Sequence, residues 1–130
     1  MIEKDIDIKF LSNIFNDYKE DYKFIPNEFT KVYAYITNEK IVGFVIFDVI
    51  YEKCEIIDIF TEEEYRKQGI ALSLIKEIEK DFAVENITLE VREDNIAAIK
   101  LYEKLGFKKV SIRKNYYKDV NGILMLKEIR

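Results

Sequence analysis

A short basic segment that contains one glycine is a candidate site for an anionic ligand. It reads Arg66-Lys67-Gln68-Gly69-Ile70-Ala71 and separates a β-rich stretch from an amphipathic one. If a helix starts there, its first main-chain N–H groups point outward and its dipole favours an anion such as a pyrophosphate. Gly69 has no side chain that would keep a phosphate from the main chain. The segment is neither a Walker loop nor the three-glycine dinucleotide motif, so a solvated basic turn explains these six residues equally well.

A carboxylate and a phenol in the second half of the chain are candidates for proton transfer. Glu90 alternates with Leu89 and Val91, so it should point to the opposite face of a sheet. It could act as a general base, although a solvated carboxylate near a strand end is the commoner case. Tyr102 could protonate a thiolate, since the reference pKa of a phenol is ~10 and that of a thiol is ~8.5. It could also be one more core aromatic among nine tyrosines.

The residue counts exclude several kinds of catalyst. The chain of 130 residues has no histidine and one cysteine, Cys54. The lack of histidine excludes triads built on that residue and most zinc sites. It also leaves Cys54 without the base that would make it a nucleophile. Glu62-Glu63-Glu64 lacks the ligand spacing of a calcium loop, so we expect no metal cofactor.

Charge and hydropathy bear on partners and location. The net charge of -4 and a pI near 5.1 argue against direct binding of nucleic acid. No apolar run approaches the roughly 20 residues that cross a membrane, and the first residues do not resemble a secretion signal. A single cysteine fits a reducing compartment. We therefore expect a cytoplasmic protein with no membrane contact. The charged pairs Lys108-Lys109 and Arg113-Lys114 are expected to face outward.

The spacing of apolar residues predicts an α/β (α+β) fold in a single domain that covers residues 1–130. Short turns make the first strands an antiparallel meander, and a helix then connects the third strand to a parallel neighbour. Asn95 or Asp94 caps the last helix, Gly106 ends it, and Asn121-Gly122 forms the turn of a final hairpin. A further short helix near Glu28 is left open. The predicted helices are 5–20, 70–82 and 96–105, and the predicted strands are 32–37, 41–51, 55–61, 86–92, 107–117 and 123–128.

Two motifs and the order of elements resemble the GCN5-related N-acetyltransferase (GNAT) superfamily. Arg66-x-x-Gly69-x-Ala71 fits its pyrophosphate signature, Gln/Arg-x-x-Gly-x-Gly/Ala. A longer motif is more specific and is similar to the RimI-like subgroup, which acetylates the N-terminal alanine of a ribosomal protein. It reads Leu89-Glu90-Val91-Arg92-x-x-Asn95-x-Ala97-Ala98-Ile99-x-Leu101-Tyr102-x-x-Leu105-Gly106-Phe107 and continues in Ile112-Arg113-Lys114-Asn115-Tyr116-Tyr117.

The resemblance implies a mixed central sheet with helices on both faces and a role for each matching residue. Acetyl-CoA would be the co-substrate and would lie where the third strand and strand 86–92 diverge. Glu90 would be the general base and Tyr102 the general acid. The residues implied to bind the cofactor are Ile59, Phe60, Thr61, Arg66, Lys67, Gln68, Gly69, Ile70, Ala71, Leu72 and Asn95.

This interpretation leaves more than one acceptor open. The implied acceptor is a ribosomal protein N-terminus, but the chain lacks the aromatic Pro-Trp element of relatives in residues 21–30 and has a trimmed final hairpin. Both regions shape the acceptor pocket in the superfamily. A small amine, an aminoacyl-tRNA or a lysine side chain is therefore an alternative acceptor, and a non-catalytic acyl-CoA-binding module is a third hypothesis.

Overall fold

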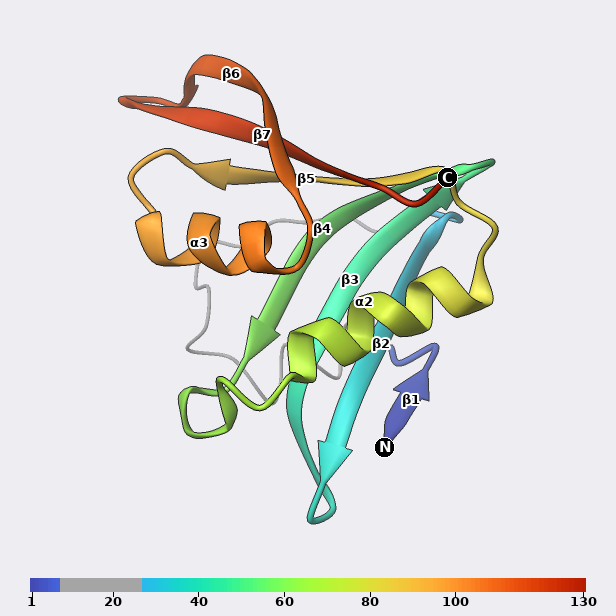
Figure 1. Ribbon diagram of the computed structural model, residues 1–130. Coiled ribbons are helices and arrows are strands. Elements are labelled where there is room, and N and C mark those ends of the chain that lie inside the picture. Colours follow the sequence, from blue (N-terminus) through green and yellow to red (C-terminus); the bar gives the residue numbers. More distant parts are fainter. Residues whose placement is uncertain (8–26) are drawn as a thin grey trace.

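One mixed sheet forms the centre of the molecule (Figure 1). The computed structural model describes residues 1–7 and 27–130. Within them the sheet has the strand order β1-β2-β3-β4-β5-β7-β6. The strands are β1 (Ile2–Lys4), β2 (Thr30–Thr37), β3 (Lys40–Ile50), β4 (Lys53–Thr61), β5 (Asn86–Arg92), β6 (Lys108–Tyr117) and β7 (Val120–Glu128), and the helices are η1 (Glu63–Tyr65), α2 (Ile70–Asp81) and α3 (Ile96–Lys104).

Strands β2, β3 and β4 form the predicted antiparallel meander, and α2 carries the chain across to β5. β5 pairs with β4 in parallel, but only from Lys53↔Asn86 to Ile56↔Leu89. A register shift in the β3–β4 pair leaves Ile57 as an extra residue in β4 at this point. Such a bulge bends a strand and increases its twist, so β4 continues along β3 while it leaves β5. The two strands are therefore joined at one end and open at the other.

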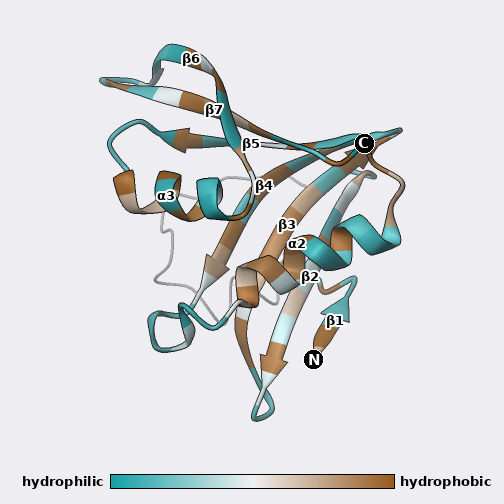
Figure 2. Ribbon diagram, in the orientation of Figure 1, coloured by the Kyte–Doolittle hydropathy of each residue, from teal (hydrophilic) through white to brown (hydrophobic). Residues whose placement is uncertain are grey.

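Helices α2 and α3 cover the same face of the sheet (Figure 1). Leu74, Ile75 and Ile78 of α2 and Ile99 of α3 belong to one buried cluster with residues of the central strands. Figure 2 shows hydrophobic residues along β3 and β4 in the middle of the sheet, whereas β6 at the edge is exposed along most of its length. None of the helices in the described part of the chain is long and apolar enough to cross a membrane.

The opposite face has its own buried cluster, which consists of Val32, Ala34, Ile41, Phe44 and Ile46. The helix predicted for residues 5–20 would cover a second face, but residues 8–26 lie outside those described. Residues 5–7 are not helical, and the segment before them is the short strand β1, which sequence periodicity did not predict. Glu28 lies in a turn that leads into β2 rather than in a helix.

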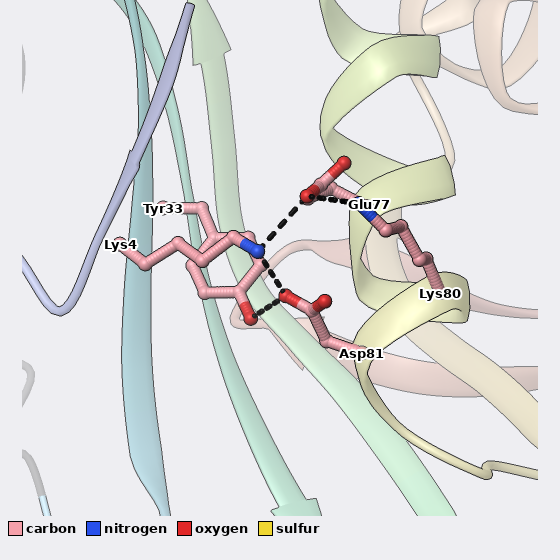
Figure 3. A network of polar contacts seen from close by, with 5 residues as sticks. All are labelled: Lys4, Tyr33, Glu77, Lys80 and Asp81. Carbon is pink, nitrogen blue, oxygen red and sulfur yellow. Dashed lines mark hydrogen bonds and ion pairs between the residues drawn. The ribbon is translucent and has the colours of Figure 1, made fainter.

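A network of polar contacts ties β1 to α2 across the edge of the sheet (Figure 3). The Lys4 ammonium lies 2.9 Å from the Glu77 carboxylate and 2.7 Å from that of Asp81. The Tyr33 hydroxyl donates a hydrogen bond of 2.6 Å to the same Asp81 oxygen. Lys80 approaches Glu77 at 3.6 Å. The network joins β1, β2 and α2, so it adds to the pairing with β2 that holds this strand of three residues.

The turn of the final hairpin differs from the prediction. It is formed by Lys118 and Asp119, with Lys118 at a φ of 66°, whereas Asn121 and Gly122 lie inside β7. A Cβ at position 122 would lie 3.0 Å from Cβ of Tyr116. The glycine is therefore needed because an aromatic side chain packs directly on the main chain there, rather than because it forms the turn.

Candidate active site

The open end of the β4–β5 pair defines the site. Ile59, Phe60 and Thr61 follow the last parallel pair, and they are held on their other edge by β3. Ile59 packs into the cluster beneath α2, while Phe60 packs into the cluster on the opposite face. This end of β4 therefore has a fixed position, and the main chain on its β5 side has no strand partner among the described residues.

The loop after β4 leads from this open end to the start of α2. Arg66 Nε donates a hydrogen bond of 3.0 Å to the Thr61 carbonyl and so ties the loop to the strand. Lys67 and Gly69 have φ angles of 65° and 77°. Arg66, Lys67, Gln68 and Gly69 are exposed, Ile70 is buried, and Ala71 and Leu72 are half-buried.

These residues fit a pyrophosphate. Within the described part of the chain, the amides of Lys67, Gln68 and Gly69 make no main-chain hydrogen bond, and the first amides of any helix lack an intrahelical acceptor. A Cβ added at Gly69 would meet no atom within 4 Å. The loop thus presents unpaired donors at the N-terminus of a helix of 12 residues, next to open space, which is an arrangement that suits an anion. Buried Ile70 can contribute only its main chain.

Glu90 is a shielded carboxylate on the sheet face opposite α2 and α3. Its neighbours Leu89 and Val91 are buried in the cluster beneath those helices, as the alternation predicts. The Glu90 side chain is 15% exposed, and neither of its oxygens accepts a hydrogen bond from the described residues. Burial raises the pKa of Glu90, the Arg113 cation opposes this effect, and the Glu55 carboxylate adds to it. A carboxylate with a raised pKa and free lone pairs is suited to accept a proton.

Arg113 is exposed, as expected for an outward-facing charge, and it also pairs with Glu90. Its Nε lies 2.9 Å from Glu90 Oε1, although neither oxygen accepts a hydrogen bond in this geometry. β6 reaches Glu90 only through β7, and the β6–β7 register shifts on both sides of Arg113. Sequence spacing could not predict this pair, because a register shift lies between Arg113 and Tyr117, next to the hairpin turn.

Tyr102 projects from α3 into a largely apolar environment. Its ring lies edge-on to Phe107 at 6.1 Å between centroids and packs against the main cluster. Burial raises the pKa of Tyr102 to about 12, and the charges of Asp58 and Tyr117 add to the effect. The phenol therefore stays protonated near neutral pH and can act as a proton donor. Tyr117, whose own pKa is raised mainly by burial, with contributions from Tyr116 and Glu90, is a residue of this region that the sequence patterns did not single out.

Asn95 and Cys54 serve the structure. The Asn95 side-chain oxygen accepts a hydrogen bond of 3.1 Å from the Ala98 amide and caps α3. Its amide nitrogen remains for a ligand. Cys54 is buried and burial raises the pKa of its thiol to about 12, so it is not poised as a nucleophile. No group of three or more acidic or cysteine side chains among residues 1–7 and 27–130 is arranged to hold a metal ion.

Comparison with known sequences identifies related proteins. The sequence model of the Acetyltransferase (GNAT) family matches residues 4–107. An N-alpha-acetyltransferase of Saccharolobus solfataricus is 46% identical over 74 residues, which are 54% of this chain and 44% of that protein. The ribosomal protein bS18-alanine N-acetyltransferase of Escherichia coli K12 is 38% identical over 89 residues, 65% of this chain and 60% of that protein. The chain thus spans about half of the length of the relatives it matches.

Comparison with solved structures gives the same result over more of the chain. The ribosomal-protein-S18-alanine N-acetyltransferase from Escherichia coli superposes with a TM-score of 0.79 at 27% identity and covers 99% of this chain and 94% of that one. A Bacillus anthracis protein described as a streptothricin acetyltransferase, in complex with acetyl coenzyme A, superposes with a TM-score of 0.75 at 25% identity. The matched region covers 86% of this chain and 72% of the Bacillus anthracis protein.

Proposed function

Because the chain belongs to the acetyltransferase (GNAT) family, we propose that it transfers the acetyl group of acetyl-CoA to a primary amine. The amine is the α-amino group at the N-terminus of a protein, and an N-terminal alanine of a ribosomal protein is the first candidate. The observation that carries the proposal is the Glu90 carboxylate, whose side chain is 15% exposed and accepts no hydrogen bond from the described residues. It lies on a sheet whose β4 and β5 diverge at the same level. Ribosomal proteins are made in the cytoplasm, which is where we place the reaction.

The donor site consists of the open end of β4–β5 and the loop that follows. The amides of residues 67–72 would hold the pyrophosphate, with Arg66 fixing the loop against Thr61. Main-chain groups of Ile59, Phe60 and Thr61 would hold the pantetheine and the thioester, and the Asn95 side chain would contact the pantetheine from the start of α3. Acetyl-CoA supplies an activated acetyl carbon, and the donors along β4 would favour the negative charge that develops on its oxygen.

The proton transfers divide between two residues. Glu90 would accept a proton from the acceptor's ammonium, whose reference pKa of ~7.7–8.0 makes a modest base sufficient. The amine nitrogen would then bond to the acetyl carbon while the carbon–sulfur bond breaks, and the nitrogen would release its second proton to water. Tyr102 would donate its proton to the departing sulfur and regain one from water. Neither a metal nor a covalent enzyme intermediate is needed for these steps.

The choice of acceptor rests on the relatives and on charge. One related protein is named an N-alpha-acetyltransferase, and another is named a ribosomal protein bS18-alanine N-acetyltransferase. In this chain, Asp48, Glu55 and Glu90 occupy positions on adjacent strands, and Asp48 pairs directly with Glu55 in the β3–β4 register. A face that carries these carboxylates attracts a cationic terminus more strongly than a neutral molecule.

A panel of acceptors tests the proposal. The chain is incubated with acetyl-CoA and a peptide that starts with alanine and continues with basic residues, and the products are sequenced by mass spectrometry. We expect one acetyl group on the α-amino nitrogen. The matched control is the same peptide with a formylated N-terminus and free lysines, which should stay unmodified. Acetylation of the lysines or of a polyamine, with none at the free α-amino group, would contradict the proposed acceptor.

A further inference from the structure

Glu90 is paired with a cation from its own chain, Arg113. Arg113 Nε lies 2.9 Å from Glu90 Oε1, and the Arg113 side chain is 52% exposed whereas that of Glu90 is 15% exposed. The contact is an ion pair without a directed hydrogen bond, because neither Glu90 oxygen accepts one from the described residues. A pair that lacks good hydrogen-bond geometry and has one exposed partner is weak and can open at low cost.

The Arg113 guanidinium also contacts an aromatic ring. Its guanidinium lies 5.5 Å from the centroid of the Tyr116 ring. That ring in turn packs on the main chain of Gly122, where an added Cβ would be 3.0 Å from Tyr116 Cβ, and it meets Tyr117 edge-on at 4.9 Å. Tyr116 thus offers the guanidinium a cation–π contact that does not depend on Glu90.

We propose that the Arg113 guanidinium occupies the position that the acceptor's ammonium takes at Glu90, and that acceptor binding exchanges one cation for the other. This inference rests on the proposed function, since it takes Glu90 to be the base. Arg113 is then a positioning residue, which acts through Glu90 and leaves the carboxylate when the acceptor arrives. The Tyr116 contact and the surrounding water receive the displaced guanidinium.

The charges around Glu90 explain why a resident cation is useful. Arg113 and Tyr117 face it from β6 and Glu55 from β4, while its partner across β5–β7 is the apolar Leu124. Burial and Glu55 both favour the protonated carboxyl, which could not accept a proton from an ammonium. Arg113 opposes both effects and so favours the ionised base until the acceptor replaces it.

The variant Arg113→Gln separates this exchange from a purely structural role. Without the cation, the pKa of Glu90 should rise, so the acid limb of the kcat/KM profile should move to higher pH. On the plateau of that profile the acceptor no longer competes with Arg113, and its KM should fall about two- to fivefold, the range expected for a weak exposed pair. The kcat at saturating acceptor should stay within about twofold of wild type. Arg113→Lys, which keeps the charge, should retain the wild-type acid limb.

A measurement on the protein without substrate supports the kinetic test. The carboxyl ¹³C resonance of Glu90, assigned by its loss in Glu90→Gln, is titrated in wild type and in Arg113→Gln. We expect its midpoint to be higher in the variant. The matched control is Lys109→Gln, which removes a cation from the same strand at a position that pairs with buried Met125; it should leave the midpoint unchanged.

The outcomes distinguish this inference from the proposed function. A higher acceptor KM in Arg113→Gln, or an unchanged Glu90 midpoint, would overturn the exchange even if Glu90→Gln is inactive. Full activity of Glu90→Gln would instead contradict the role of Glu90 as base, whatever Arg113 does. In the Glu90→Gln background, the effect of Arg113→Gln on KM should disappear, since the two residues act on one another.

Discussion

Gly43 of β3 lies directly beneath Ile70, the first residue of α2. A Cβ at position 43 would be 3.0 Å from Ile70 Cγ2 and 3.0 Å from the Phe60 carbonyl oxygen. The helix N-terminus and the open end of β4 therefore meet over a position where only glycine fits. This contact sets where the amides of the loop point relative to the strand that would hold the thioester.

Gly43→Ala should weaken acetyl-CoA binding without any direct contact to the ligand. The added methyl group must push Ile70 or the β4 main chain away, and overpacking of this kind costs about 1–3 kcal/mol. We expect a lower Tm and a higher Kd for acetyl-CoA, measured by calorimetry. The contrasting variant is Gly122→Ala, which crowds Tyr116 on the acceptor side and should leave the Kd for acetyl-CoA near that of wild type. Equal Kd values in both variants and wild type would show that α2 does not position the ligand.

Gly69→Ala tests whether the loop amides bind the pyrophosphate. A φ of 77° is strained for alanine, by roughly 1–2 kcal/mol, and the methyl group would project into the space proposed for the ligand. The Kd for acetyl-CoA should rise about tenfold or more, which corresponds to about 1.4 kcal/mol. Gly106→Ala is the matched control, since Gly106 has a φ of 101° and its Cβ would meet only the flexible end of Lys127. If both variants lost stability equally and neither lost affinity, the pyrophosphate would lie elsewhere.

Much of the fold follows from local sequence patterns. The bounds of β5 agree with the predicted strand 86–92, because alternating apolar residues on a half-buried strand give an unambiguous period. The start of α3 agrees because Asn95 caps it. Its end at Lys104 lies one residue before the predicted one, next to Gly106 with its positive φ. These signals are local, so they can be read without knowing which strands pair.

The features that sequence missed depend on contacts between distant elements. β1 has three residues and no period of its own, and it exists because it pairs with β2. The Asn121-Gly122 pair resembles a hairpin turn, but packing of Tyr116 on Gly122 fixes the register and moves the turn to Lys118 and Asp119. Because this register depends on packing, the sequence also did not predict that Arg113 pairs with Glu90. The positions of the site residues were implied by family resemblance, and their roles remain proposals.

Glu55→Gln should change the pH dependence of catalysis. Glu55 is one of the groups that raise the pKa of Glu90. In wild type, the acid limb of kcat/KM should therefore lie above the ~4.3 of an ordinary glutamate. Removal of the neighbouring carboxylate should move this limb to lower pH, which is opposite to the shift expected for Arg113→Gln. Glu52→Gln removes a charge from the turn before β4 and serves as the control; an identical shift in that variant would mean that net charge alone is responsible.

Lys4→Met should destabilise the protein in a way that depends on pH. The Lys4 ammonium lowers the pKa of Asp81 and of Glu77, chiefly through its hydrogen bonds to them. A lowered carboxyl pKa contributes stability that is present above the unfolded-state value and is lost as the pH falls through the folded-state value. The same contacts raise the pKa of Lys4. The stability that Lys4 contributes is therefore present at a pH below its unfolded-state pKa, and it is lost as the pH rises through its folded-state pKa.

The difference in Tm between wild type and Lys4→Met should therefore be largest near neutral pH. It should shrink in acid, below the carboxyl reference values of about 4, and in alkali, above the lysine reference value of about 10.4. Lys80→Met is the control, because Lys80 is more exposed and its contact with Glu77 is longer, at 3.6 Å. A Tm difference that is constant across this range would assign the effect to packing of the lysine stem instead of charge.

The central claim is that Glu90 accepts the proton of an acceptor held beside acetyl-CoA at the open end of β4 and β5. The most direct test is the single-turnover rate of acetyl transfer to an alanine-starting peptide by Glu90→Gln, with the Kd for acetyl-CoA measured on the same samples. We predict a rate about 100-fold or more below that of wild type, as expected for loss of a general base, with the Kd within about twofold. Tyr102→Phe, measured alongside, should also be slower with the Kd preserved. A wild-type rate for Glu90→Gln would contradict the account.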